Sequence, residues 1–322
     1  MKIEDIKYTL PTVPIEGQDF DREKWLKENP IDYFKFLYIL LNSKEQYPQI
    51  PSDIVTSVVF DVLYSVIRIY IPNTLYKFYS LNENSEMNEK KFETLQNNQI
   101  FMSDLKEFND PFDGKAFFYN PKDLASIPRL MPHNGRFIDD FTAFVKGTSL
   151  TENDTSCMPM WAHYGNNHRG FCVAYDMKNP NNKSLASCTF PVQYTSERLD
   201  ITSFMKDYAI MISSEIERYK IIGEKKIVIN DLSMVYLMQY LINIKHSSWQ
   251  YEKEFRCTMG ALAKGMPYAD AFSKAIYIGM NCSAQHSKRL IEIGKRLSIP
   301  VYQMKFDDLS EQYELKEDLI TK

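Results

Sequence analysis

This sequence of 322 residues lacks the signatures of several large enzyme classes. It contains no GxGxxG dinucleotide fingerprint, no GxxxxGK(S/T) phosphate loop, no HExxH zinc motif and no GxSxG nucleophile elbow. A Rossmann dinucleotide enzyme, a P-loop NTPase, a zincin and an α/β-hydrolase each need one of these motifs. The sequence therefore excludes the usual forms of all four classes.

A pairing pattern for the cysteines is missing as well. The chain has five cysteines, an odd number, and no two of them are spaced as Cys-x-x-Cys. A disulfide framework is not expected, and reduced thiols in a cytoplasmic protein are the default interpretation. The first residues, Met1-Lys2-Ile3-Glu4-Asp5, carry acidic side chains at once, so they do not predict a signal peptide.

Long apolar runs and basic tracts are also scarce. The most apolar stretch, Val55 to Pro72, contains Asp61 and Arg68, whereas a membrane span needs about 20 largely uncharged residues. We interpret this stretch as a buried helix and expect no membrane partner. Lys and Arg number 38 against 42 Asp and Glu, without a basic tract, so no dedicated duplex nucleic-acid surface is expected.

The pattern of the sequence changes at Pro72. Residues 1–71 predict a helical extension, with helices at 21–41 and 52–69. Residues 72–306 predict an α+β domain, and residues 307–322 a C-terminal tail. The domain's expected strands are 74–80, 100–103, 171–176, 190–194, 250–259, 275–279 and 301–306; its expected helices are 87–97, 160–164, 204–222, 231–246 (capped by Asp231) and 283–297, with one further helix and a polar loop at 134–154.

Residues 250–259 hold the most informative pattern. Side chains alternate between the two faces of a strand, so Glu252, Glu254 and Arg256 would share a polar face opposite a mostly apolar one. In a cleft, two such carboxylates can stabilise a cationic transition state or act as general base. A solvated sheet face, with Arg256 balancing Glu254, explains the same pattern, and both interpretations stay open.

A second cluster lies in residues 158–173. Trp161 and Tyr164 are three residues apart on a short helical turn, so they would be neighbours on one face. His168, at the end of the following loop, could donate to a phosphate or a hydroxyl group. A core tryptophan beside a tight loop is the structural alternative.

The same region contains four possible zinc ligands, Cys157, His163, His168 and Cys172. Their spacing, Cys-x5-His-x4-His-x3-Cys, is not a familiar zinc pattern and has no CxxC knuckle. We therefore expect no metal, and zinc is kept only as a weak alternative.

Several segments, in combination and in this order, resemble the signatures of the bacterial domain of unknown function 2971 family. They are Leu75-Tyr76-Lys77-Phe78-Tyr79-Ser80, Asn109-Asp110-Pro111-Phe112-Asp113, Met160-Trp161-Ala162-His163-Tyr164 with His168-x-Gly170-x-Cys172, Trp249-x-x-Glu252-x-Glu254-x-Arg256, and the strand Ala275 to Gly279. The resemblance covers residues 74–306. The family name assigns no activity, and a role in bacterial stress or phage defence is what the resemblance permits.

The layout is also similar to the fold of NAD-dependent ADP-ribosyltransferases. That fold opens with a strand bearing a basic or aromatic NAD contact, and its catalytic Glu comes late, in one branch at the end of a Glu-x-Glu motif. The resemblance implies a mixed split β-sheet with flanking helices, NAD as substrate, Glu254 as the catalytic residue, and Glu252 as the residue that orients or deprotonates the acceptor. The NAD-binding residues that it implies are Tyr76 or Lys77 on the opening strand, Trp161 or Tyr164 as a stacking ring, and Lys77, His168 and Arg256 for the diphosphate.

The leading hypothesis is therefore an ADP-ribosyltransferase-like enzyme whose acceptor, a macromolecule or a small molecule, is unknown. The alternative from another class is a non-catalytic nucleotide- or protein-sensing module, with the N-terminal helices as its partner surface. A third hypothesis is a metal-dependent nuclease that uses Glu252, Glu254 and Asp110, with the metal neutralising the acidic site.

Overall fold

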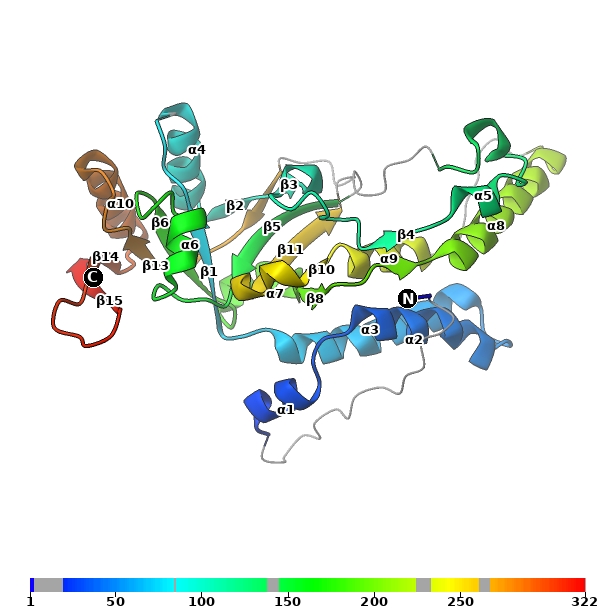
Figure 1. Ribbon diagram of the computed structural model, residues 1–322, viewed down its shortest axis with the longest axis horizontal. Coiled ribbons are helices and arrows are strands. Elements are labelled where there is room, and N and C mark those ends of the chain that lie inside the picture. Colours follow the sequence, from blue (N-terminus) through cyan, green and yellow to red (C-terminus); the bar gives the residue numbers. More distant parts are fainter. Residues whose placement is uncertain (3–19, 84, 138–144, 224–232, 261–266, 322) are drawn as a thin grey trace. The chain divides into compact units, whose positions relative to one another are not determined.

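A computed structural model describes residues 1–2, 20–83, 85–137, 145–223, 233–260 and 267–321 of the chain (Figure 1). These residues form two compact units that alternate along the sequence. The first comprises Met1–Tyr70, Leu105–Phe144 and Gln193–Ser248, and the second comprises Ile71–Asp104, Val145–Val192 and Trp249–Lys322. In the described ranges, no helix has both the length and the apolar character needed to cross a membrane.

The first unit is mainly helical. Its helices are α1 (Arg22–Glu28), α2 (Tyr33–Gln46), α3 (Ser52–Ile67), η2 (Arg68–Tyr70), η3 (Leu105–Glu107), α5 (Pro121–Leu124), η4 (Met131–His133), α8 (Thr202–Ile221) and α9 (Ser233–Leu241). Two short parallel strand pairs belong to it, β4 (Phe117–Phe118) with β9 (Leu199–Asp200), and β8 (Gln193–Thr195) with β10 (Ile244–His246). The rings of Phe60 and Tyr236 stack with their centroids 4.2 Å apart and join α3 to α9.

The second unit is built on a nine-stranded mixed sheet with the order β15-β14-β13-β6-β1-β5-β11-β7, in which β3 also pairs with β5. Only β13 and β14 run parallel; the other described pairs are antiparallel. The strands are β1 (Thr74–Tyr79), β3 (Ser103–Asp104), β5 (Val145–Thr151), β6 (Phe171–Asp176), β7 (Thr189–Pro191), β11 (Glu254–Gly260), β13 (Ser273–Ile278), β14 (Val301–Phe306) and β15 (Leu315–Thr321). A separate pair joins β2 (Gln99–Phe101) to β12 (Tyr268–Asp270).

Helices cover both faces of this sheet. Leu75, Val173 and Ile276 pack in one apolar cluster with side chains of α4 (Ser85–Gln96) and α10 (Ala284–Leu297). Phe78, Cys172 and Met304 pack in a second cluster with α6 (Met158–His163). The shorter helical segments are η6 (Pro180–Asn182), α7 (Lys183–Ser187) and η7 (Ser247–Glu252). The α+β class and the mixed sheet with flanking helices are confirmed.

Elements with strong local signals match the sequence prediction. Residues 171–175 are a continuous apolar run at the centre of the sheet, and they make up most of β6. α10 begins after Ser283, whose side chain accepts a hydrogen bond from the His286 backbone N–H, and it ends at Ser298 with a φ of 56°. The parallel strands β13 and β14 flank this helix, as the expected strand–helix–strand unit requires.

Several local predictions differ from the structure. The stretch Val55 to Pro72 is not a fully buried helix, because Val58 and Val62 of α3 are 57% and 47% exposed. The strand expected at 100–103 divides between β2 and β3. Residues 145–151 form the strand β5, which pairs with β1 on one side and with β11 on the other, rather than part of a helix and a polar loop. The prediction was wrong because the serine and threonine residues of this segment are also typical of loops. Residues 190–194 divide between β7 and β8. The helix expected at 231–246 is α9 followed by β10, and its expected cap, Asp231, lies outside the described residues. Residues 250–259 are likewise not one strand, as described below.

The sequence predicts three independently folding parts: an extension at 1–71, a domain at 72–306 and a tail at 307–322. This division stays a prediction. The compact units also divide next to Pro72, between Tyr70 and Ile71, but the first unit takes in residues 105–144 and 193–248. Within the expected tail, Leu315–Thr321 forms β15 and pairs with β14.

Candidate functional site

The two glutamates of the candidate site lie on different elements. Glu254 is the first residue of β11, whereas Glu252 ends the 3-10 helix η7. Lys253, between them, has a φ of 44°, a left-handed conformation that few residues other than glycine adopt. This change of backbone direction breaks the expected alternation, so Glu254 and Arg256 share a strand face and Glu252 does not belong to the strand.

Glu254 is held by a serine and an arginine. The Ser149 hydroxyl donates to Glu254 Oε1 at 2.5 Å. The Arg256 guanidinium donates to both carboxylate oxygens, Nε to Oε1 at 2.8 Å and Nη2 to Oε2 at 3.2 Å. The two charged side chains are 0% and 3% exposed, so the interpretation as a solvated sheet face is wrong. The pair is a buried, bidentate ion pair that fixes the carboxylate in one orientation.

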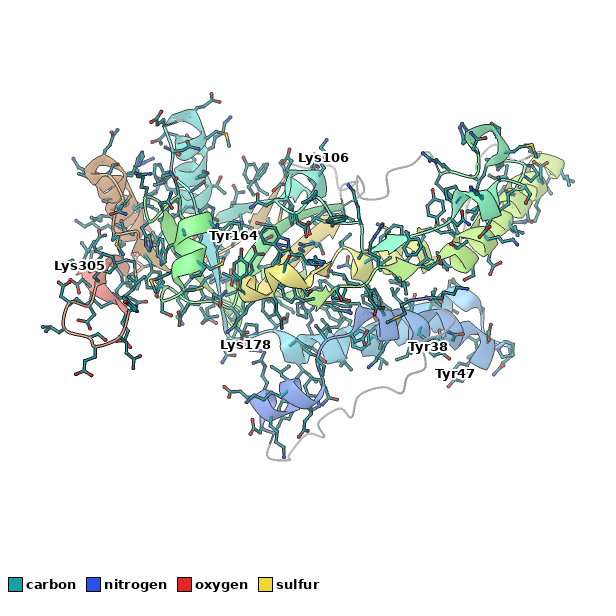
Figure 2. All side chains as sticks on the ribbon, viewed as in Figure 1. Tyr38, Tyr47, Lys106, Tyr164, Lys178 and Lys305 are labelled. Carbon is teal, nitrogen blue, oxygen red and sulfur yellow. The ribbon has the colours of Figure 1, made fainter. Side chains whose placement is uncertain are left out.

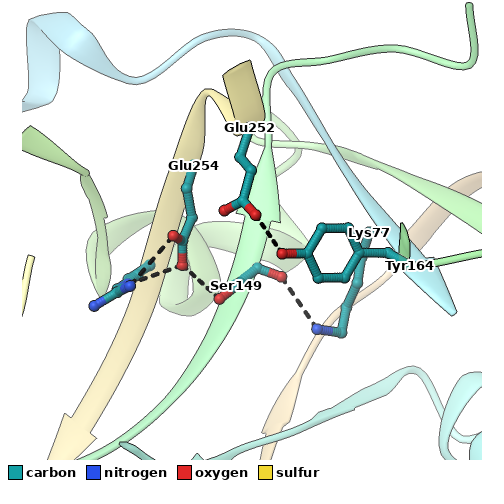
Figure 3. Close-up of polar contacts among 6 residues, drawn as sticks. Lys77, Ser149, Tyr164, Glu252 and Glu254 are labelled. Carbon is teal, nitrogen blue, oxygen red and sulfur yellow. Dashed lines mark hydrogen bonds and ion pairs between the residues drawn. The ribbon is translucent and has the colours of Figure 1, made fainter. Parts of the chain in front are cut away.

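Glu252 has a different kind of partner. The Tyr164 hydroxyl donates to Glu252 Oε1, and Thr151 Oγ1 donates to the Glu252 backbone carbonyl at 2.6 Å. Tyr164 follows α6, so this bond joins the helix to the end of η7 (Figures 2 and 3). The site therefore contains one carboxylate paired with a cation and one that accepts a hydrogen bond from a neutral hydroxyl.

Lys77 reaches the site from the face of the sheet opposite to Glu254. In the described register, β1 pairs with β5 at Tyr76 and Thr151, and Thr151 also lies opposite Glu254. Tyr76 and Glu254 therefore share a face, and Lys77, the next residue along β1, belongs to the opposite face. Its ammonium donates to the Ser149 carbonyl oxygen at 3.1 Å (Figure 3). Burial lowers the pKa of Lys77 to about 8, although the nearby Glu254 charge acts in the opposite direction.

Trp161 is part of the core. Its side chain is 0% exposed, and its Nε1 donates to the Thr155 carbonyl oxygen at 2.8 Å. The Phe78 ring meets it edge-on at 5.0 Å between centroids, and the His168 ring stacks on it at 5.7 Å. This placement matches the structural alternative, because the buried indole has no exposed face on which an NAD ring could stack.

The loop that carries His168 has an unusual backbone. Asn166, Asn167 and His168 all have a positive φ, from 49° to 63°. Two glycines, one just after this loop and one just after β13, allow close approaches of the backbone. A Cβ at Gly170 would lie 1.9 Å from the Tyr79 carbonyl oxygen, and one at Gly279 would lie 2.3 Å from the His168 carbonyl oxygen. Burial lowers the pKa of His168, and its Nδ1 has no hydrogen-bond partner in the described part of the chain.

Tyr76 is half-buried on the same face of the sheet as Glu254. Burial, followed by the charges of Asp154, Cys172 and Glu317, raises its pKa to about 12. Its ring lies 6.4 Å from that of Tyr277, between centroids, and points along the sheet toward β13.

The structure thus brings Glu252, Glu254, Arg256 and Tyr164 together, with Lys77 reaching the same strand from the other face. Sequence reasoning missed Ser149 and Thr151, because residues 145–151 were not interpreted as a strand. The available signal was the run Thr148-Ser149-Leu150-Thr151, in which β-branched residues and hydroxyls fit a pleated strand.

The structure gives no support to the zinc site or to the metal site of the nuclease hypothesis in the described residues. Among the residues that the structure describes, no group of three or more His, Cys, Asp or Glu side chains could hold a metal ion. The zinc alternative at Cys157, His163, His168 and Cys172 is therefore not supported. For the nuclease alternative, Asp110 belongs to the first unit and the two glutamates to the second.

The comparisons with known proteins give one family. The sequence model of a family described as a protein of unknown function (DUF2971) matches residues 160–257. The resemblance to this family is thereby confirmed for the segment from α6 to β11, which contains Tyr164, Glu252, Glu254 and Arg256. No curated protein and no solved structure matches the chain.

Proposed function

We propose that the residues around Glu254 form the active site of an NAD-dependent ADP-ribosyltransferase-like enzyme. The observation that carries the proposal is the hydrogen bond from Ser149 to Glu254, because it orients a carboxylate at the place where β1, β5 and β11 meet. In this reaction the bond between nicotinamide and ribose breaks, and positive charge develops on the ribose. A fixed carboxylate stabilises that charge.

Glu254 and Glu252 would act differently because their partners differ. Glu254 is held by a guanidinium and a hydroxyl, which favour the anionic carboxylate that faces a cationic transition state. Glu252 accepts from the Tyr164 hydroxyl at the end of η7, outside the strand, and a carboxylate held there can take a proton from the acceptor. We assign the charge-stabilising role to Glu254 and the acceptor-deprotonating role to Glu252.

The sequence has no Ser-Thr-Ser strand ahead of the glutamate pair, in which it departs from the ADP-ribosyltransferase pattern. The hydroxyl groups beside the two glutamates are supplied instead by Ser149 and Thr151 of β5. Tyr76 remains the proposed NAD contact on this face, and Tyr164 the proposed stacking ring. Arg256, expected at the diphosphate, is fully buried against Glu254, so we assign it the role of holding that carboxylate. His168 stays a proposal for the diphosphate. The resemblance implies the same role for Lys77, but its ammonium lies on the opposite face of the sheet, where it donates to the Ser149 carbonyl oxygen.

Location and process belong to this proposal too. The five cysteines, all among the described residues, form no disulfide, which fits a reducing, NAD-rich cytoplasm. A role in bacterial stress or phage defence, with an unknown acceptor, stays an extension of the family resemblance.

The test is nicotinamide release from NAD by the full chain, with and without bacterial lysate as a source of acceptors. Compared at equal concentrations of folded protein, Glu254→Gln should lower release by about 10²–10³-fold. Ser149→Ala should lower it less, because Arg256 still holds the carboxylate. Glu252→Gln, whose amide oxygen still accepts from Tyr164, should keep release and lose modification of the acceptor. Glu93→Gln, an exposed residue of α4, is the matched charge control and should leave release unchanged.

A second candidate is the non-catalytic sensing module. Two observations favour it: Arg256 offsets the charge of Glu254, and α3 presents an apolar stripe of Ile54, Val58 and Val62, which are 52%, 57% and 47% exposed. If the wild-type chain releases no nicotinamide under any of these conditions, this candidate replaces the enzyme. If wild type and Glu254→Gln are equally active, Glu254 is not the catalytic carboxylate.

A further inference from the structure

Three tyrosines form a row on the face of the sheet that carries α6. The rings of Tyr277 and Tyr302 stack in parallel, with centroids 5.1 Å apart and an interplanar angle of 12°. Tyr76 meets Tyr277 at 6.4 Å with a tilt of 55°. The three residues come from β1, β13 and β14, and each is half-buried, so each ring keeps part of its surface in contact with solvent. We call this set the tyrosine row.

Two exposed carboxylates accompany the tyrosine row. Glu317 lies on β15, and its Oε1 accepts a hydrogen bond from the Thr155 hydroxyl. Asp154 Oδ1 accepts from the Ser156 backbone N–H at 2.9 Å and from the Ser156 hydroxyl at 2.6 Å. In the register of β14 and β15, Glu317 lies opposite Met304, which is two residues from Tyr302 and on the same face of the sheet. The hydrogen bond from Thr155 brings Asp154, the preceding residue, to the same end of β15. In agreement with this placement, both charges raise the pKa of Tyr76. Within the described ranges, neither carboxylate is ion-paired with a cationic side chain.

On the opposite face of β15, the charged side chains form ion pairs. Asp318, the next residue after Glu317, is ion-paired with Lys305 at 2.6 Å (Lys305 is labelled in Figure 2). Lys316, the residue before it, is 3.4 Å from Asp307. The acidic side chains on that face therefore have their own cations, whereas the face with the tyrosine row carries negative charge and aromatic rings without one.

From this arrangement we infer that the tyrosine row, together with Asp154 and Glu317, binds an arginine side chain of a polypeptide partner. A guanidinium is planar and weakly hydrated, so it can stack on a tyrosine ring while its N–H groups donate to a carboxylate. An ammonium group satisfies the carboxylate but lacks the flat surface. The partner is a polypeptide because the rings and carboxylates lie on the outside of a sheet, where a side chain projecting from another chain can reach them. This inference does not depend on the proposed NAD chemistry.

The test uses the full chain and four probes, with binding followed by saturation-transfer NMR at low salt. The probes are an acetylated and amidated Gly-Arg-Gly peptide, the same peptide with citrulline, the same peptide with lysine, and free arginine. Citrulline has the shape of arginine without its charge. We expect the arginine peptide to bind at least about tenfold more tightly than the citrulline peptide and more tightly than the lysine peptide, and to weaken as salt rises.

Two matched variants locate the site. Glu317→Gln should weaken binding of the arginine peptide by about three- to tenfold, and so should Tyr302→Ala. Asp318→Asn removes the same charge from the other face of β15 and should leave binding unchanged. Equal binding of the arginine and citrulline peptides would overturn the inference, as would equal effects of Glu317→Gln and Asp318→Asn. Tighter binding of free arginine than of the peptide would overturn the polypeptide as the source.

Discussion

Ser149 donates its hydroxyl hydrogen to the Glu254 carboxylate across two neighbouring strands, 105 residues apart in the sequence. In the register of β5 and β11, Ser149 lies directly opposite Arg256, and Thr151 lies opposite Glu254. The serine hydroxyl therefore reaches diagonally past its direct partner, while Arg256 folds back onto the same carboxylate. One buried carboxylate thus joins two strands, and its surroundings decide what a substitution there would do.

The first prediction concerns the ion pair of Glu254 and Arg256. Glu254→Gln should lower the free energy of unfolding by about 3–5 kcal/mol, because it leaves the guanidinium buried without a counter-charge. Glu254→Gln combined with Arg256→Met should recover most of this loss, since no charge is then left unpaired. Urea unfolding of the wild type, both single variants and the double variant gives the coupling energy.

The control for this cycle is an exposed pair. Glu86 and Lys90 on α4 form an ion pair of 2.7 Å with side chains 78% and 56% exposed. Glu86→Gln should leave the stability close to that of the wild type, because water screens this pair. If Glu254→Gln behaves like Glu86→Gln, the carboxylate is not buried with Arg256, and the solvated-face interpretation returns.

The second prediction concerns β15. Deleting residues 307–322 should lower the thermal stability, although the sequence suggested a tail, because β14 would lose its partner strand and Leu315 would no longer cover the cluster around Met304. Differential scanning calorimetry measures the loss. Leu309→Ser and Tyr313→Ser, at 92% and 96% exposed positions, are the controls and should stay within about 0.5 kcal/mol of wild type. A deletion as stable as these variants would support the interpretation as a tail.

Parts of the fold with a local cause were predictable from the sequence. β6 follows from an apolar run and α10 from a serine cap and amphipathic spacing, since each signal lies within the element itself. β5 was not predictable in this way. Its Ser149 and Thr151 are polar. They donate hydrogen bonds to Glu254 and to the Glu252 carbonyl, which lie 105 and 101 residues away in the sequence. A strand that is stabilised by distant hydrogen bonds has a weak signature in its own composition.

The candidate site shows the same limit. The shared face of Glu254 and Arg256 follows from strand alternation, and it is confirmed. The placement of Glu252 does not follow, because the left-handed backbone at Lys253 carries no marker in the sequence, where glycine or asparagine would be usual. The burial of Trp161 could be weighed as an alternative, but only the packing of Phe78 and His168 around it decides the outcome.

The third prediction concerns the pH dependence that Lys77 gives to stability. Its pKa in the folded chain is about 8, whereas an unfolded lysine titrates at about 10.4. Between these values the unfolded chain binds more protons than the folded chain, so this group makes stability rise with pH through that window. The penalty for holding a buried ammonium is thus fully present below about pH 8 and is relieved above it.

From pH 8 to 9.5, the free energy of unfolding of the wild type should rise by about 1–2 kcal/mol relative to Lys77→Met. Urea unfolding at a series of pH values measures the difference, in which the tyrosines and cysteines common to both proteins cancel. Lys90→Met, at an exposed lysine, should keep the wild-type slope. Parallel curves for wild type and Lys77→Met would mean that the Lys77 ammonium is hydrated in the folded chain, and that its contact with the Ser149 carbonyl does not shield it from water.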